Sequence, residues 1–113
     1  MKKTISVYRT EKIKTDIEVE FPIYRKHDLL LDDADVVYYQ RTDHDGWEVS
    51  IKKSYDYLGK NLSFELERSE GNTLNGATDL DYALGRGDHA SSAEEFHTVL
   101  AEAIEFAKIF AAK

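Results

Sequence analysis

Apolar and polar residues alternate strictly near the start of this chain, and this period constrains its fold more than any other feature. In "TDIEVEFPIY" every second side chain from Ile17 to Ile23 is apolar, and most of those between are carboxylates. Successive side chains of a β-strand point to opposite faces, so the pattern predicts a strand with one face on a core and one in water. Pro22 has no N–H to donate, which is typical of a strand end or an edge strand.

The same period recurs over residues 3–68 and predicts a sheet. Further strands are expected around Ile5 and Val7, and in "ADVVYYQR", "WEVSIKK" and "NLSFELER". The links "TEKIKT", "TDHDG" and "DYLGKN" are short and rich in turn residues, which is typical of connections between antiparallel neighbours. We therefore expect an antiparallel sheet of about four to five strands.

The C-terminal segment has a helical period instead. In "SSAEEFHTVLAEAIEFAKIFAAK" apolar residues recur every three or four positions from Phe96 to Phe110. The segment begins with two serines, each followed three residues later by a glutamate, which is a helix-start signal. The pattern predicts one long helix over residues 92–112, packed on one face of the sheet in a single α+β domain that spans residues 1–113.

Residues 69–90 form the connection between the expected sheet and the expected helix. Four of the six glycines of the chain lie in this segment. A connection this long is often functional or mobile. Thr78 and Asp81 have the spacing of a capping box, and Gly85 stands where a short helical turn would end. We therefore expect a glycine-rich loop interrupted by one short helical turn.

The residue types present exclude several kinds of chemistry. Without cysteine the chain has no disulfide, no thiolate zinc site and no cysteine nucleophile. No serine stands in a Gly-x-Ser-x-Gly turn, and no glycine loop follows a strand to cradle phosphate. "DHDG" supplies two of the oxygens that a calcium loop needs, and no histidine pair has helical ligand spacing. We therefore expect a non-enzymatic protein with no metal and no cofactor.

The chain is acidic, with a net charge of −7 that is unevenly placed. Residues 1–14 carry five cations and one acid (+4), residues 15–68 carry seven cations and 13 acids (−6), and residues 69–105 carry one cation and eight acids (−7). Direct binding to nucleic acid needs clustered cations and is not expected. An acidic surface can instead attract a basic protein, although acidity that serves solubility alone gives the same composition. No apolar run reaches the length of a membrane span, and we expect a soluble, cytoplasmic protein.

Aspartates and tyrosines are the candidate binding residues. "HDLLLDDADVVYYQRTDHDG" places both types near strand ends, where a tyrosine adds contact area and an aspartate can meet a cation. Tyr38 and Tyr39 must point to opposite faces of their strand. The candidate partner-binding residues are Asp32, Asp33, Asp35, Tyr38, Tyr39, Asp43 and Asp45, with a second patch at Asp79, Asp81 and Asp88.

A resemblance to a class of proteins adds to this hypothesis. A small, acidic, cysteine-free, strand-rich chain with "EVEFPIYRKHD" early and one amphipathic helix late resembles proteins carried by phages and mobile elements, among them anti-CRISPR inhibitors and nucleic-acid mimics. The resemblance implies a non-enzymatic inhibitor that blocks a basic, nucleic-acid-binding surface of a CRISPR effector or similar machine. It concerns overall character and assigns no role to any residue.

Two other classes of function are open from the sequence. An immunity protein or antitoxin that neutralises a basic nuclease toxin would carry the same charge. A small enzyme or ligand-binding domain would place its site in the loop 69–90. The sequence also leaves open whether the chain is a monomer or a homodimer.

Overall fold

Six strands, one long helix and two short helical turns make up the described part of the chain. The structure is a computed structural model, and it describes residues 1–9, 13–31, 34–57, 61–71 and 76–111. In chain order the elements are β1 (Lys2–Arg9), β2 (Ile13–Glu20), β3 (Ile23–Leu30), β4 (Ala34–Thr42), β5 (Trp47–Asp56), β6 (Asn61–Glu70), α1 (Leu80–Ala83), the 3₁₀ turn η1 (Gly87–His89) and α2 (Ala93–Ala111).

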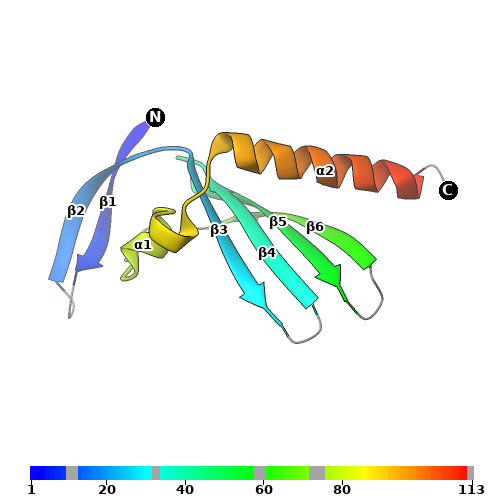
Figure 1. The fold of residues 1–113 in the computed structure, drawn as a ribbon. Coiled ribbons are helices and arrows are strands. Elements are labelled where there is room, and N and C mark those ends of the chain that lie inside the picture. Colours follow the sequence, from blue (N-terminus) through cyan, green and yellow to red (C-terminus); the bar gives the residue numbers. More distant parts are fainter. Residues whose placement is uncertain (10–12, 32–33, 58–60, 72–75, 112–113) are drawn as a thin grey trace.

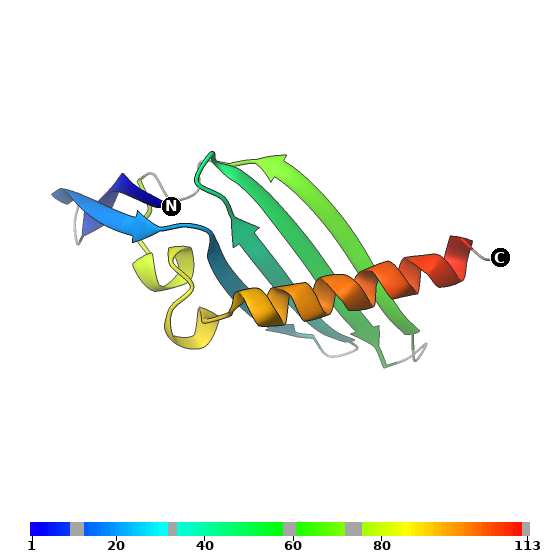
Figure 2. The same cartoon turned by 90° about the horizontal axis from the view of Figure 1, so that it is seen from above.

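The strands form two antiparallel sheets, which Figure 1 shows. β1 and β2 pair in a hairpin, and β3, β4, β5 and β6 form a four-stranded sheet in that order. α2 runs diagonally across one face of the four-stranded sheet, as the view from above shows (Figure 2). The α+β class, the antiparallel sheet and the long C-terminal helix are therefore present, with six strands in place of the expected four to five.

The alternating segment from Ile17 to Ile23 is not one strand. β2 ends at Glu20 and pairs with β1, whereas β3 begins at Ile23 and pairs with β4. Pro22 lies between the two and follows a cis peptide bond. The sequence did not predict β3. Arg25 lies at an inward position of this strand and is 2% exposed, whereas an alternating pattern has apolar residues at inward positions.

The strand register decides which side chains lie under α2. Lys26, Tyr39 and Ile51 are neighbours across β3, β4 and β5. Tyr39 and Ile51 pack in the same cluster as Phe96 of α2, so this row lies on the face that α2 covers. Because side chains alternate along a strand, Arg25 and its row lie on the opposite face.

Two hydrophobic clusters hold the elements together. The first joins the β1–β2 hairpin to α1, and its buried members are Ile5, Val7, Val19, Phe21, Ile23 and Ala83. The second joins α2 to the four-stranded sheet, and its buried members are Ile51, Phe96, Val99 and Ala103. Phe96 is 1% exposed, and burial of a side chain of this kind contributes about 1.5–3 kcal/mol.

A buried ion pair joins the four-stranded sheet to α1. The Arg25 guanidinium donates from Nη2 to Glu48 Oε1 at 2.9 Å and from Nη1 to the Ala83 carbonyl at 3.3 Å. The Thr42 hydroxyl donates to the same Glu48 oxygen at 3.1 Å, and Arg25 Nε donates to Gln40 Oε1 at 3.0 Å. A charged pair is tolerated in the interior when its hydrogen-bonding groups have partners in this way.

The connection 69–90 contains the short helical turn that the sequence predicts. Its cap is Asp79, whose carboxylate accepts from the Tyr82 N–H at 3.1 Å, so the cap expected at Thr78 is one residue too early. Gly85 follows the C-cap residue Leu84. It has a φ of +65° and approaches the Tyr24 carbonyl so closely that a Cβ would overlap its oxygen.

Candidate functional site

The strongest candidate site is a groove between α2 and the four-stranded sheet. The strands slope away from α2 toward the C-terminal ends of β3 and β5 (Figure 1). Two hollows, of about 380 Å³ and about 630 Å³, lie between the helix and the strands. Thr98 and Glu102 line both hollows, so the two are parts of one groove, which we call the α2 groove.

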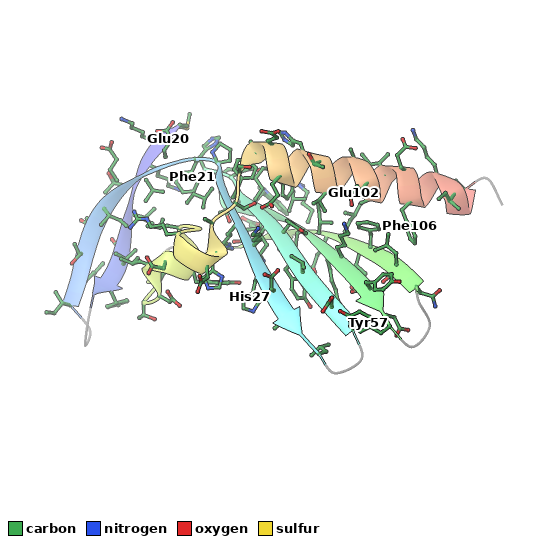
Figure 3. All side chains as sticks on the ribbon, viewed as in Figure 1. Glu20, Phe21, His27, Tyr57, Glu102 and Phe106 are labelled. Atoms are coloured by element: carbon green, nitrogen blue, oxygen red, sulfur yellow. The ribbon has the colours of Figure 1, made fainter. Side chains whose placement is uncertain are left out.

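The α2 groove has a polar half and an apolar half. The smaller, polar half is lined by Tyr39, Lys53, Ser92, Glu94, Glu95, Thr98, Val99 and Glu102. The larger, apolar half is lined by Leu62, Phe64, Thr98, Ala101, Glu102, Glu105, Phe106 and Ile109. Figure 3 labels Glu102 and Phe106, which α2 contributes to this groove.

Two lysines of the sheet hold carboxylates of α2 in the polar half. Lys53 Nζ donates to Glu102 Oε2 at 2.7 Å, and Lys26 Nζ donates to Glu95 Oε2 at 3.2 Å. All four side chains are between 32% and 44% exposed. Such exposed pairs contribute little to stability, roughly 0–1 kcal/mol each, so a partner can compete for either member at small cost.

Tyr39 lies in the polar half beside Lys26, its neighbour across β3 and β4. Burial raises the pKa of the Tyr39 phenol above 10.0, and the carboxylate of Glu95 raises it further. The hydroxyl is therefore protonated at neutral pH. It can offer a hydrogen bond to a partner, and it cannot serve as a base.

Aromatic and aliphatic side chains form the apolar half. The rings of Phe64 and Phe106 lie 5.2 Å apart between centroids. Leu62 and Ile109 remain 37% and 55% exposed beside them. Exposed apolar side chains gathered in a hollow mark a place where another molecule can be bound.

Two exposed tyrosines adjoin the apolar half. Tyr55 is the cross-strand neighbour of both Asp35 and Leu62, so these three side chains share the face that α2 covers. The Tyr57 hydroxyl donates to the Asp35 carboxylate, and the rings of Tyr55 and Tyr57 meet edge to face with centroids 5.7 Å apart. The hydrogen bond that the Tyr57 hydroxyl donates to Asp35 raises the pKa of the Tyr57 phenol above 10.0. Figure 3 labels Tyr57 near the lower end of β5.

Negative charge exceeds positive charge around the groove. Among the residues that the structure describes, its lining carries four carboxylates and one lysine: Glu94, Glu95, Glu102 and Glu105 against Lys53. The excess of three negative charges favours a cationic partner.

The structure places few of the aspartates and tyrosines singled out by the sequence at this groove. Tyr39 lines its polar half and Asp35 shares that face of the sheet, whereas Tyr38 is half-buried on the opposite face of β4. Asp43 and Asp45 lie in the turn after β4. Asp43 is eight residues from Asp35, which is about 27 Å of extended chain, and Asp45 lies two residues farther on. Asp43 pairs with Arg41 at 3.0 Å, and Asp45 accepts from the Trp47 N–H at 3.1 Å.

The second predicted patch lies around α1 and η1, away from the α2 groove. Asp79 caps α1, Asp81 lies within it and Asp88 lies in η1. Asp32 and Asp33 fall outside the residues that the structure describes. The eight described candidates therefore do not form one contiguous surface, and their roles in partner binding stay predictions.

Most of the groove was missed by sequence reasoning. Thr98, Glu102, Glu105 and Ile109 follow helical spacing beside the buried stripe of α2, which is a signal that the sequence does contain. That signal does not say which strand faces them. The pairing order of the sheet places β6 opposite these residues, and this order depends on contacts between residues far apart in the chain.

Within the described ranges, no three histidine or carboxylate side chains are grouped so that they could hold a metal ion. In the same ranges, no helix has both the length and the apolar character needed to cross a bilayer. Comparisons of the chain with protein-family models, with curated proteins and with solved structures found no match.

Proposed function

We propose that this chain is a non-enzymatic binding protein whose α2 groove receives a basic segment of a protein partner. The partner is expected to be nucleic-acid-binding machinery, and the bound chain blocks its basic surface. The observation that carries the proposal is the excess of carboxylates lining a groove that exposed tyrosines adjoin.

The carboxylates supply the attraction in this proposal. Arginine and lysine form charge-assisted hydrogen bonds with carboxylates, and arginine can do so through two parallel bonds. Glu95 and Glu102 already bind lysines of the sheet at the groove, so the same oxygens are placed to accept from a partner's cations. Attraction of this kind speeds association and weakens as salt is added.

The tyrosines supply contact area. Tyr55 and Tyr57 are 42% and 47% exposed. Tyrosine buries a large surface at small entropic cost and is enriched among residues that dominate binding energy. Arginine side chains stack on such rings, so a basic partner gains from the aromatic residues as well as from the carboxylates.

Tyr39 and Tyr57 supply hydrogen-bond donors at and beside the groove. A general base needs a pKa near the working pH. Tyr39 and Tyr57, whose pKa values are both raised above 10.0, move away from that range. Both phenols stay protonated and act as hydrogen-bond donors.

Charge reversal at the groove tests the proposal. The triple variant Glu94→Lys, Glu102→Lys, Glu105→Lys changes exposed side chains that line the groove. The matched control Asp45→Lys, Asp81→Lys, Asp88→Lys changes the same charge at exposed positions away from it. The measurement is the affinity for a fluorescent oligo-arginine peptide over a series of salt concentrations.

The two variants are expected to differ. The groove variant loses several charge contacts, so its affinity for the peptide should fall by about tenfold or more. The affinity of the control should stay within about twofold of that of the parent chain. Equal losses in both variants would show that only net charge matters. A larger loss in the control would move the binding surface to the sequence-predicted patches and overturn the proposal.

A further inference from the structure

β6 is an edge strand of the four-stranded sheet, and among the described residues the only strand it pairs with is β5. The outer edge of such a strand presents backbone N–H and C=O groups that no other strand of the sheet satisfies. The strand is ten residues long, Asn61–Glu70, and eight of these residues are exposed. An edge of this length can accept an additional strand.

α2 extends past this edge. Figures 1 and 2 both show its C-terminal end projecting beyond β6. Ile109 near that end is 55% exposed, and it lines the apolar half of the groove with Leu62 and Phe64 of β6. A strand added beside β6 would lie under the projecting end of α2, and its side chains on that face would meet an apolar surface.

The other face of β6 is acidic. Glu65 and Glu67 alternate with Phe64 and Leu66, so they point away from α2. Glu65 is 75% exposed at its side chain and lies 3.8 Å from Lys52, and Glu67 is exposed as well. A strand added at this edge would meet carboxylates on the face opposite to the apolar one.

We infer that β6 accepts an extended basic segment of a protein partner, in which lysine or arginine alternates with apolar residues. The apolar side chains pack beneath the end of α2 against Phe64 and Ile109, and the cationic side chains meet Glu65 and Glu67. Backbone hydrogen bonds along β6 supply affinity, and the alternation supplies specificity. The basic character of the partner rests on the proposed function. The docking edge does not, because it is separate from the polar half of the groove.

A second copy of this chain is a poorer occupant of the edge than a basic segment. It would bring the same two glutamates to the interface and a second net charge of −7. A basic segment neutralises these carboxylates instead. Complementary charge therefore favours the basic segment.

Two synthetic peptides of identical composition test the inference. In one, lysine alternates with valine; in the other, the lysines and valines are segregated into two blocks. Fluorescence anisotropy measures the affinity of the intact chain for each. Because only the alternating peptide can place its two residue types on opposite faces, it should bind about tenfold more tightly or better. The backbone amide protons of β6 should gain protection from exchange with solvent when the alternating peptide binds.

Single variants locate the contact. Ile109→Asp should weaken binding of the alternating peptide by about tenfold or more, because it places a charge against the apolar face. Leu31→Asp is the matched control, since Leu31 is 52% exposed and lies after β3 at the far side of the sheet from β6, and it should change binding by less than about twofold. Both positions are exposed, so both variants should fold.

The outcomes separate this inference from the proposed function. Equal affinity for the two peptides, with unchanged exchange at β6, would overturn docking at the edge. If oligo-arginine binding still depended on the groove carboxylates, the proposed function would stand without it. Concentration-dependent dimers that Ile109→Asp abolishes would assign the edge to a second copy and also overturn the inference.

Discussion

Arg25 and Glu48 form an ion pair inside the protein, with 2.9 Å between Arg25 Nη2 and Glu48 Oε1. Their side chains are 3% and 8% exposed. Through Arg25 the pair also reaches the Ala83 carbonyl, so β3, β5 and α1 are joined at one guanidinium. The pair fixes α1 against the face of the sheet that α2 leaves open.

Removal of one partner of this pair should destabilise the fold strongly. Arg25→Met leaves the Glu48 carboxylate buried without its cation, and we expect a loss of about 3–5 kcal/mol in the free energy of unfolding. Urea denaturation measures this loss. The double variant Arg25→Met, Glu48→Met removes both charges and should be less destabilised than Arg25→Met alone. A double variant at least as unstable as the single one would contradict the account.

Tyr57 should titrate at a higher pH than a free tyrosine. The hydrogen bond to Asp35 raises its pKa above 10.0, and burial adds to the shift. Because the folded pKa lies above the unfolded one, this contribution to stability is present below pH 10.0 and is lost as the pH rises through the folded value. Residue-resolved NMR of the tyrosine rings during an alkaline titration measures the pKa of Tyr57.

The variant Asp35→Asn tests whether the hydrogen bond to Asp35 raises the pKa of Tyr57. It removes the charge and the strongest acceptor at the Tyr57 hydroxyl, so the titration should move toward the ordinary tyrosine value. Tyr39 serves as the internal control, because its raised pKa arises from burial and Glu95 instead. A shift of Tyr39 with no shift of Tyr57 would contradict the assignment.

Gly85 should tolerate a side chain less well than Gly87. Both have positive φ, +65° and +59°, so alanine at either position costs about 1–2 kcal/mol in backbone strain. At Gly85 the added Cβ would also overlap the Tyr24 carbonyl oxygen, whereas at Gly87 nothing lies within 4 Å. Urea denaturation of Gly85→Ala and Gly87→Ala should therefore show the larger loss for Gly85→Ala. Equal losses would show that the Tyr24 backbone moves freely.

Local periods in the sequence predicted the elements that bury one face. The segments "WEVSIKK" and "NLSFELER" lie in β5 and β6, and the long helix spans Ala93–Ala111. The serine signal also located the start of α2, where the Ser92 hydroxyl accepts from the Glu95 N–H at 3.1 Å. These features depend on residues near one another in the chain, which is why the sequence shows them.

β3 and the groove depend on distant residues, and the sequence did not reveal them. Arg25 can occupy an inward position only because Glu48 meets it from 23 residues away. The groove arises because β6, at the edge of the sheet, comes to lie under the last turns of α2. The aspartates of the predicted surface were grouped by their nearness in sequence, but the extended β4 separates Asp35 from Asp43.

We propose above all that a basic partner binds in the α2 groove. The most direct measurement is the change in backbone amide NMR shifts when an oligo-arginine peptide is added to the intact chain. The account predicts that the largest changes fall on Tyr39, Lys53, Thr98 and Glu102 and shrink as salt is added. Changes confined to the turn at 43–46 and to residues 79–89, with the groove unaffected, would contradict it.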